Sequence, residues 1–326
     1  MKLAIIGTGK IVKEVLPILS EIENISLISI LSTQRSINTA NELSKKFNIL
    51  NVTTDYNDIL NNSNINTVYI ALPNSLHYEY SLKALNNNKH VICEKPFTMT
   101  LNELNELIKI SKEKNLFLLE AITNQYLKNF FYIKENLQKI GDIKIVNCNY
   151  SQYSSRYDEF KKGKNPTVFD PKLGGGALRD LNIYNIHFIV GLFDFPKGNI
   201  NYYPNIEKDI DTSGVLIMDY ESFKVVCIGA KDCDGGNNVK SVIQGNKGSI
   251  FINGPTNTLP EIEIKLNDGF SEKVNKNINK HRMYEEFIEF ANVIENKNFE
   301  KRNKYLEHSL KVMNVLEKAI NSMNKK

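Results

Sequence analysis

The first 120 residues alternate between short apolar runs and segments with helical periodicity. The run at 3–6 is entirely apolar and ends at Gly7, which predicts a buried parallel strand. In the next segment apolar side chains recur every three or four residues, and Pro17 is expected to kink that helix or end its regular part. The alternation continues with predicted strands at 25–33, 65–72, 90–93 and 116–119, and predicted helices at 40–47, 77–85 and 101–111. Strands that alternate with helices predict a doubly wound parallel sheet, an α/β architecture.

After about residue 121 the pattern becomes that of half-buried strands. Stretches of alternating apolar and polar positions follow one another, separated by short turns, at 143–153, 213–220, 223–228, 239–244 and 249–252. Such a series predicts a large, mostly antiparallel sheet in an α+β domain. Two amphipathic helical patterns follow, at 282–294 and 304–323. We therefore predict one domain over 1–121 and a second over 122–326, whose last helices can pack back on the first domain.

Composition limits the classes of protein to consider. The 326 residues are 41% hydrophobic and 24% charged, enough for two cores. The net charge of +4 is not concentrated in one stretch, so we do not expect a nucleic-acid partner. No apolar run reaches the ~18 residues of a membrane span, and the four cysteines lack the spacing of a metal site or disulfide framework. We expect a cytoplasmic globular protein without a bound metal.

A glycine-containing turn directly follows the first predicted strand and opens the first predicted helix. Glycine lets the backbone turn tightly and approach a pyrophosphate, which rests on the helix N-terminus. Val12 stands where a small residue is usual, and we expect it to loosen the packing of the helix on the strand. In this position the turn predicts a Rossmann dinucleotide-binding domain. The residues expected to hold the cofactor here are Gly7, Thr8, Gly9, Lys10 and Ile11.

The stretch 31–36, after the second predicted strand, holds no acidic residue. An acid at this position usually binds the ribose 2′-hydroxyl of NAD. Arg35 can instead pair with the 2′-phosphate of NADP, although an arginine in a loop is often simply solvated. The sequence therefore favours NADP as the cofactor, with NAD as the alternative.

Two further predicted strands end in segments that carry candidate chemistry, at the sheet edge where ligands bind in such folds. The motifs of interest along the chain are Gly7-Thr8-Gly9, Ala71-Leu72-Pro73-Asn74 with His77, Glu94-Lys95-Pro96, Leu119-Glu120-Ala121, and Gly174-Gly175-Gly176-Ala177-Leu178 with Asp180. In this order and spacing they make the chain resemble the Gfo/Idh/MocA family of oxidoreductases over essentially its whole length. The resemblance implies a Rossmann domain followed by a substrate domain.

The resemblance implies a role for the lysine of the Glu-Lys-Pro motif, which in this family lies near the nicotinamide and the reacting oxygen. Lys95 is then expected to donate a hydrogen bond to the substrate oxygen and to stabilise developing negative charge. The alternative for a lysine at a strand end is a solvated side chain. The same resemblance places a set of residues beside the cofactor: Ala71, Leu72, Pro73, Asn74, His77, Glu94 and Lys95.

A second cluster follows the glycine-rich segment. If this stretch is helical, Asp180, Tyr184 and His187 share one face. The chain resembles the dihydrodiol dehydrogenase and glucose–fructose oxidoreductase branch of the family, in which a tyrosine is the proposed acid/base. This implies that Tyr184 exchanges the proton with the help of the Lys95 cation and that Asp180 orients the substrate or Tyr184. His187 is the rival proton donor, and half-buried structural roles are the alternative for both.

Four polar residues are candidates for contact with substrate on grounds of polarity and placement: Tyr126, Tyr153, Arg156 and Asn182. The function we expect is hydride transfer between NADP(H) or NAD(H) and a hydroxyl or carbonyl group of a small polyol, sugar, cyclitol or diol. Two alternatives stay open: an NAD-dependent redox-type glycoside hydrolase, and a nucleotide-binding sensor without chemistry.

The second predicted sheet is expected to need a cover on one face. Alternating apolar residues such as Ile145, Val225 and Ile228 indicate such a face. We therefore expect a homodimer or homotetramer that pairs through this sheet. Members of the family that the chain resembles commonly pair in this way.

Overall fold

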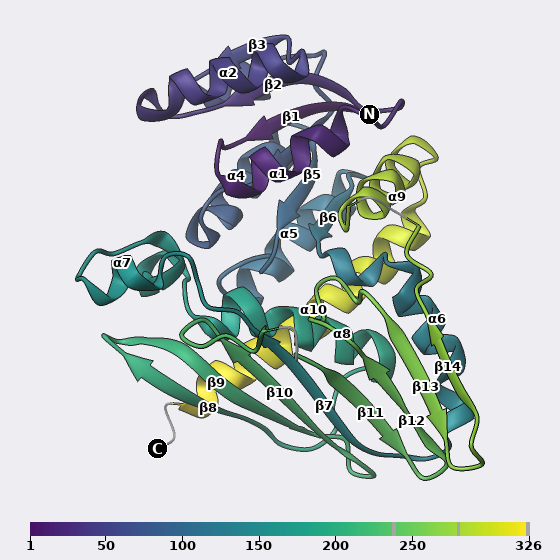
Figure 1. Ribbon diagram of the computed structural model, residues 1–326. Coiled ribbons are helices and arrows are strands. Elements are labelled where there is room, and N and C mark those ends of the chain that lie inside the picture. The colour runs from purple at the N-terminus through teal and green to yellow at the C-terminus, as the bar shows by residue number, and fades with distance from the viewer. Residues whose placement is uncertain (237–238, 279–280, 324–326) are drawn as a thin grey trace. The chain divides into compact units, whose positions relative to one another are not determined.

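The computed structural model describes residues 1–236, 239–278 and 281–323 (Figure 1). The chain divides into two compact units. The first consists of Met1–Ala121 together with Met283–Leu310, and the second of Ile122–Arg282 together with the chain from Lys311. The segment from Met283 to Leu310 therefore groups with the first unit although it follows the second in sequence.

The first unit is built on a six-stranded parallel sheet, drawn in purple to blue in Figure 1. The strands pair in the order β3-β2-β1-β4-β5-β6, and every pair is parallel. The apolar run 3–6 is fully buried, as a central strand covered on both faces requires. The doubly wound sheet is confirmed. Its strands are β1 Lys2–Ile6, β2 Ser26–Leu31, β3 Asn51–Thr53, β4 Thr67–Ile70, β5 His90–Glu94 and β6 Leu118–Ala121.

Helices connect these strands and return to the unit at the end of the chain. They are α1 Lys10–Leu19, α2 Ile37–Phe47, α3 Tyr56–Leu60, α4 His77–Asn86, α5 Leu101–Glu113, α9 Tyr284–Glu295 and the first part of α10 Phe299–Met323. Helix α1 continues through Pro17 and ends two residues later, so the proline stands in its last turn. Val12 is fully buried in the core, and its expected effect on the packing of the helix on the strand stays a prediction.

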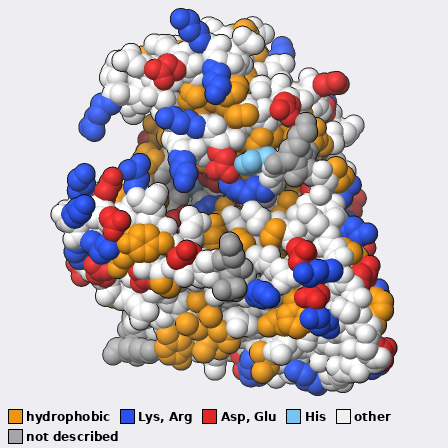
Figure 2. Space-filling view, in the orientation of Figure 1, with side chains coloured by type: hydrophobic (Ala, Val, Ile, Leu, Met, Phe, Trp, Pro, Cys, Tyr) orange, Lys and Arg blue, Asp and Glu red, His pale blue; other side chains and the backbone are white. Residues whose placement is uncertain are grey.

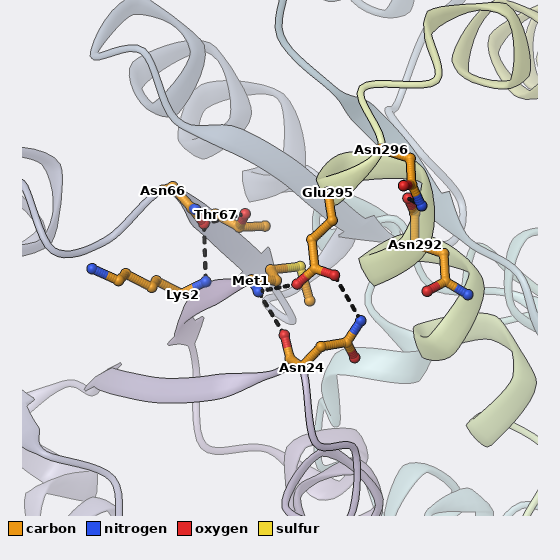
Figure 3. A network of polar contacts seen from close by, with 8 residues as sticks. All are labelled: Met1, Lys2, Asn24, Asn66, Thr67, Asn292, Glu295 and Asn296. Carbon is orange, nitrogen blue, oxygen red and sulfur yellow. Dashed lines mark hydrogen bonds and ion pairs between the residues drawn. The ribbon is translucent and has the colours of Figure 1, made fainter.

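A polar network ties α9 to the start of the sheet (Figure 3). The amine of Met1 donates to the carbonyl oxygen of Asn24 and lies 2.8 Å from Glu295 Oε1. The Asn24 amide donates to the other oxygen of Glu295 at 2.9 Å. The backbone N–H of Lys2 donates to Asn66 Oδ1 at 3.1 Å. These bonds join β1, the turn before β2, the turn before β4 and α9, which lie far apart in the sequence.

The second unit is built on an eight-stranded sheet, drawn in teal and green in Figure 1. The order is β14-β13-β12-β11-β7-β10-β9-β8, and all neighbours are antiparallel except β7 and β10. The mostly antiparallel sheet is therefore confirmed. The strands are β7 Ile143–Ser151, β8 Ile200–Glu207, β9 Ile210–Asp219, β10 Lys224–Ala230, β11 Ser241–Gly245, β12 Gly248–Ile252, β13 Ile262–Leu266 and β14 Ser271–Val274. The helices of this unit are α6 Lys128–Asn136, α7 Tyr157–Lys161, α8 Ile183–Phe193 and the end of α10.

The two faces of this sheet differ in exposure. On β10, Val225 is fully buried and therefore lies on the inner face, so the expectation that it shares the open face with Ile145 and Ile228 is wrong. Because side chains alternate along a strand, the register places a different apolar set on the outer face. That set is Ile145, Tyr203, Val215, Ile217, Val226 and Ile228. Figure 2 shows hydrophobic side chains gathered over this part of the sheet, low in the view. We call these residues the outer-face patch.

Among the described helices, none combines the length and the apolar character that crossing a membrane would require.

The pKa of His90, at the start of β5, predicts a pH-dependent stability. Burial lowers this pKa to about 4, and the neutral ring accepts a hydrogen bond from the Phe117 N–H at 3.1 Å. In the unfolded chain the pKa is about 6.5, so protons bind the unfolded state more strongly. Stability is fully present above pH 6.5 and is lost as the pH falls from there toward 4. Between pH 7 and pH 5 we expect a loss of about 1–2 kcal/mol from this side chain.

Urea unfolding at the two pH values measures this loss. The His90→Gln variant keeps an acceptor for the Phe117 N–H but does not titrate, so its unfolding free energy should depend less on pH. Equal pH dependence in the two proteins would contradict the assignment to His90.

Candidate active site

A pocket of about 510 Å³ opens at the carboxyl ends of β1, β2 and β4, within the first unit. In the strand order β3-β2-β1-β4-β5-β6 the chain reverses direction across the sheet between β1 and β4, which is where ligands bind in such folds. The pocket is lined by Gly7, Thr8, Gly9, Leu31, Ser32, Thr33, Gln34, Ser36, Thr54, Tyr56, Ala71, Leu72, Pro73 and Tyr80. Six of these were predicted as cofactor contacts from the sequence, namely Gly7, Thr8, Gly9, Ala71, Leu72 and Pro73.

The turn after β1 has the geometry of a nucleotide cradle. Gly7 has φ +119°, and its N–H donates to the carbonyl of Leu31 at 3.0 Å. A Cβ at Gly7 would stand 2.6 Å from the carbonyl oxygen of Ala71, so only glycine fits there. A Cβ at Gly9 would meet nothing within 4 Å. Gly9 is the N-cap of α1, whose first N–H groups have no partner within the helix. The open space at Gly9 therefore faces a site suited to a pyrophosphate.

The end of β2 supplies hydroxyl and amide groups to the same pocket. The Ser32 hydroxyl is buried and has no hydrogen-bond partner among the described residues. Thr33 and Ser36 bond each other reciprocally, and Gln34 donates to Thr54 Oγ1 at 3.1 Å. No aspartate or glutamate is among the described residues that line the pocket. The donor set fits a ribose that carries an anionic group, so the residues present fit a dinucleotide.

Arg35 is exposed and stands in sequence between two lining residues, but it does not itself line the pocket. Lys10 and Ile11, at the start of α1, also lie outside the lining set. The predicted contact of Arg35 with a phosphate stays a prediction. Sequence reasoning did not name the other lining residues as cofactor contacts, namely Leu31, Ser32, Thr33, Gln34, Ser36, Thr54, Tyr56 and Tyr80. The signal for those at 31–36 was their position at the end of an apolar strand.

His77 joins the two loops that follow β4 and β5. Its ring is fully buried, with Nδ1 2.9 Å from the carbonyl oxygen of Pro96 and Nε2 3.0 Å from that of Leu72. Burial lowers the pKa of His77 and outweighs the two carbonyl contacts, so the ring is neutral and donates to one carbonyl at a time. His77 thus holds the loop that carries Lys95. Asn74 begins a short 3₁₀ turn, Asn74–Leu76, in the loop before α4.

Two buried carboxylates fix the turn around Lys95. Glu94 is 8% exposed and accepts a hydrogen bond from the Tyr69 hydroxyl at 2.5 Å. Glu120 is 3% exposed and accepts from the Phe97 N–H at 3.1 Å and from the Ser309 hydroxyl at 2.6 Å. Lys95, which precedes a cis proline, is half-buried on this turn. The contacts of Glu94 favour a structural role for its side chain rather than the predicted role beside the cofactor.

In the second unit, Asp180 lies in a π-helical turn, Leu178–Asn182, directly before α8. Sequence reasoning assumed a regular α-helix for the shared face of Asp180, Tyr184 and His187. The wider turn changes the angular relation of Asp180 to the other two, and such turns are frequent at functional sites. Asp180 Oδ2 accepts a hydrogen bond from Lys231 Nζ at 2.8 Å. Lys231 was not found from the sequence, because it is remote from every motif.

The glycines before this turn are required by close packing. A Cβ at Gly175 would stand 2.8 Å from the backbone of Val168. Gly176 has φ +109°, and a Cβ there would overlap the Asp211 carboxylate. Asp211 Oδ2 in turn accepts a hydrogen bond from the N–H of Leu178, the first residue of the π-turn, at 2.7 Å. The absence of side chains at these glycines therefore allows the turn that carries Asp180 to pack closely against β9.

The first turns of α8 place Tyr184 and His187 in a buried polar framework. Tyr184 is 6% exposed, and its ring meets that of Tyr150 edge-on at 5.7 Å. The Asn124 amide donates to the backbone carbonyl of Tyr184 at 2.9 Å. His187 is fully buried, and the Gln125 amide donates to its backbone carbonyl at 2.9 Å. The complete burial of His187 favours the structural alternative for this residue.

The four predicted substrate residues have different surroundings, and their contact with substrate stays a prediction. Asn182 is fully buried and donates to the carbonyl of Cys227 on β10, which favours a packing role. Tyr153 and Arg156 lie beside α7, where they bond Asp158 and Glu159 respectively. Tyr126 is half-buried after a 3₁₀ turn. Within the described part of the chain, no group of three or more His, Cys, Asp or Glu side chains is placed to hold a metal ion.

Comparison with known proteins assigns both parts of the chain. Residues 1–121 match the family described as "Oxidoreductase family, NAD-binding Rossmann fold", and residues 134–251 match the "GFO/IDH/MocA C-terminal domain". Scyllo-inositol 2-dehydrogenase (NADP(+)) IolU of Bacillus subtilis is 34% identical over 325 residues, covering 99% of this chain and 97% of that protein. Trans-1,2-dihydrobenzene-1,2-diol dehydrogenase of Xenopus tropicalis is 25% identical over 228 residues, covering 67% and 65%.

Solved structures show the same fold. KijD10, a 3-ketoreductase from Actinomadura kijaniata solved with NADP and TDP-benzene, superposes with a TM-score of 0.86 at 19% sequence identity, covering 99% of this chain and 97% of that one. The fold and the pocket thus define an oxidoreductase with a nicotinamide-binding Rossmann domain. The chain belongs to the Gfo/Idh/MocA family. The expected class, an enzyme that transfers hydride to or from a hydroxyl or carbonyl group, is confirmed.

The two glycines of the first turn should respond differently to alanine. Gly9→Ala leaves the backbone unstrained, so the melting temperature should stay within about 1 °C, but the new methyl group enters the open space and should weaken NAD(P)H binding about tenfold or more. Gly7→Ala should in addition lower the unfolding free energy by about 2–4 kcal/mol, since it combines a left-handed backbone with a steric overlap.

Thermal melting and NADPH fluorescence titration separate the two effects. Normal NADPH binding by a folded Gly9→Ala protein would show that the dinucleotide does not lie over this turn.

Proposed function

We propose that this enzyme is an NADP-dependent dehydrogenase that oxidises a secondary hydroxyl group of a cyclitol or a related polyol. The observation that carries the proposal is the full-length similarity to a scyllo-inositol 2-dehydrogenase (NADP(+)), which extends over 99% of this chain and includes both units. A trans-1,2-dihydrobenzene-1,2-diol dehydrogenase and a D-xylose 1-dehydrogenase (NADP(+)) are further relatives. The three names share the dehydrogenation of a small molecule that carries several hydroxyl groups.

The pocket at the end of β2 supports NADP. The Ser32 hydroxyl and the neighbouring hydroxyl and amide groups offer donors to a 2′-phosphate, whereas a carboxylate there would repel it. Arg35 is placed in sequence between Gln34 and Ser36 and adds a positive charge that can reach a bound phosphate.

In the proposed reaction, Lys95, Tyr184 and Asp180 each have a different role. Bound at the pocket of the first unit, the nicotinamide supplies the hydride acceptor. The Lys95 ammonium, on its rigid turn, donates a hydrogen bond to the substrate oxygen and stabilises the negative charge that develops there. Tyr184, as the phenolate, would take the hydroxyl proton and then release it to solvent, so that loss of one hydride and one proton turns the secondary alcohol into a ketone. Asp180 accepts a hydrogen bond from a neighbouring substrate hydroxyl and orients the ring.

The alternatives differ in what they release. A redox-type hydrolase would release a sugar without a net change in nicotinamide absorbance, and a sensor would bind nucleotide without turnover. Full-length similarity to dehydrogenases favours net oxidation. The proposed location is the cytoplasm, a reducing compartment that suits the four free cysteines.

The test is a panel of inositol isomers, pentoses, hexoses and diols, followed at the nicotinamide absorbance with NADP and with NAD. We expect turnover of at least one cyclitol, with kcat/KM higher for NADP than for NAD. Release of a sugar from a glycoside without absorbance change would support the hydrolase, and binding of NADPH without any turnover would support the sensor.

Single substitutions test whether Tyr184 or His187 is the residue that transfers the proton. Tyr184→Phe removes only the hydroxyl and should lower kcat by ~10²–10⁴-fold, the usual effect of losing a proton-transfer group. His187→Gln should keep kcat within a few-fold, since the imidazole is fully buried. A fully active Tyr184→Phe enzyme together with an inactive, folded His187→Gln enzyme would give the role to His187.

We also propose that the outer-face patch pairs two copies of the chain. A contiguous apolar surface on a sheet is rarely left in contact with water. Light scattering at micromolar concentration should give a multiple of the chain mass of 37.3 kDa. Ile217→Lys, within the patch, should shift the mass toward that of one chain. Leu50→Lys, in the first unit at a side chain that is 71% exposed, should not. A wild-type protein with the mass of one chain contradicts the proposal.

A further inference from the structure

The second unit contains a lysine whose ammonium group is buried. Lys231 directly follows β10, and its side chain is 2% exposed. Its backbone is held on both sides, by Thr212 O at 2.8 Å and by the N–H of Ser154 at 2.9 Å. Removing an ammonium group from water costs free energy unless the charge is paired and hydrogen-bonded. The partners of this group must therefore compensate its burial.

The Lys231 ammonium makes three contacts. It donates to the carbonyl oxygen of Val168 at 2.6 Å and to Asp180 Oδ2 at 2.8 Å. It also lies over the ring of Phe169, 4.5 Å from the ring centroid. Of these three partners only Asp180 carries a negative charge, so the ion pair is the contact that compensates the buried cation.

The two side chains of this ion pair, Lys231 and Asp180, differ in their exposure to solvent. The Asp180 side chain is 29% exposed, whereas its partner is inside the unit. The Lys231 ammonium, 2.8 Å from Oδ2, orients the carboxylate, and a carboxylate acts only as a hydrogen-bond acceptor. The π-turn that carries Asp180 is also held at its first residue, where Asp211 on β9 accepts the Leu178 N–H at 2.7 Å. Groups from two adjacent strands therefore fix one carboxylate that keeps an accessible side.

We propose that Lys231 is a positioning residue of the active site. It holds the Asp180 carboxylate in the orientation in which it accepts a hydrogen bond from a hydroxyl group of the substrate. The inference rests on the proposed function, in which Asp180 orients the substrate. It explains why a strand that carries no family motif ends in a buried lysine.

A purely structural role is the competing explanation, and Lys208, an exposed lysine on the same aromatic cluster, is the control for it. Lys208 donates to the carbonyl oxygens of Phe160 and Lys161 at 2.7 and 3.0 Å and lies 4.7 Å over the ring of Phe160. The rings of Phe160 and Phe169 stack at 4.7 Å, so both lysines anchor the same aromatic cluster. Lys208 has no carboxylate partner among the described residues.

The kinetic test compares three single variants and one double variant of the full chain. Lys231→Met should lower kcat/KM by about 10- to 100-fold, the usual range for losing a group that orients a functional residue. Lys208→Met should change it by less than about twofold. Asp180→Asn should also lower kcat/KM, and the double variant Lys231→Met/Asp180→Asn should be little worse than Asp180→Asn alone, because both changes act on one carboxylate.

Two further measurements keep the test decisive. If Lys231→Met does not fold, Lys231→Gln, which can still donate to the Val168 carbonyl, takes its place. In ¹⁵N spectra of the lysine ammonium groups, the resonance that disappears in the Lys231 variant should shift in Asp180→Asn and stay unchanged in Lys208→Met.

The outcomes separate the two proposals. Loss of activity in Asp180→Asn with full activity in a folded Lys231 variant overturns the inference and leaves the proposed function in place. Additive losses in the double variant also overturn it, since Lys231 would then act through the aromatic cluster. Full activity in Asp180→Asn removes Asp180 from the proposed mechanism and overturns the inference with it.

Discussion

The first unit depends on one close contact, the approach of the backbone at Gly7 to the carbonyl of Ala71. The contact joins the turn after β1 to the end of β4, the two strands between which the chain reverses direction across the sheet. A side chain at Gly7 would separate these ends. Because the contact is between backbones, the adjacent helix N-terminus stays open in front of Gly9, and the nucleotide pocket is a consequence of how the strands end.

The second recurring constraint is that charged groups inside the protein are held by specific partners. In the first unit Glu94 and Glu120 accept hydrogen bonds that tie down the turn around Lys95. In the second unit Asp211 accepts a hydrogen bond from the turn around Asp180, and Lys231 donates one to Asp180 itself. Each unit therefore carries one candidate functional side chain on a short irregular segment that is immobilised by buried polar groups. Such support places a side chain more accurately than an exposed loop can.

The similarity to known proteins and the structure of the pocket explain different aspects of this enzyme. Similarity along the whole chain assigns the class of reaction, whereas the pocket residues explain why a nicotinamide dinucleotide fits. The absence of acidic side chains from the described lining agrees with the naming of NADP in several relatives. In the second unit, the Asp180–Lys231 ion pair was not predicted from the motifs of the sequence.

Local patterns in the sequence determined the order and type of most elements. The fully apolar run at 3–6, the glycine turn after it and the alternating stretches after residue 121 each depend on neighbouring residues, so they could be interpreted without a structure. The glycine and Glu-Lys-Pro motifs located the pocket and the Lys95 turn for the same reason. Only the tertiary structure decided which face of β10 is covered, since alternation marks two faces but does not say which one packs inside; Val225 was misplaced for this reason. The π-turn at Asp180 and its pairing with Lys231 join positions 51 residues apart, and no local pattern encodes a contact between segments that meet only when the sheet has formed.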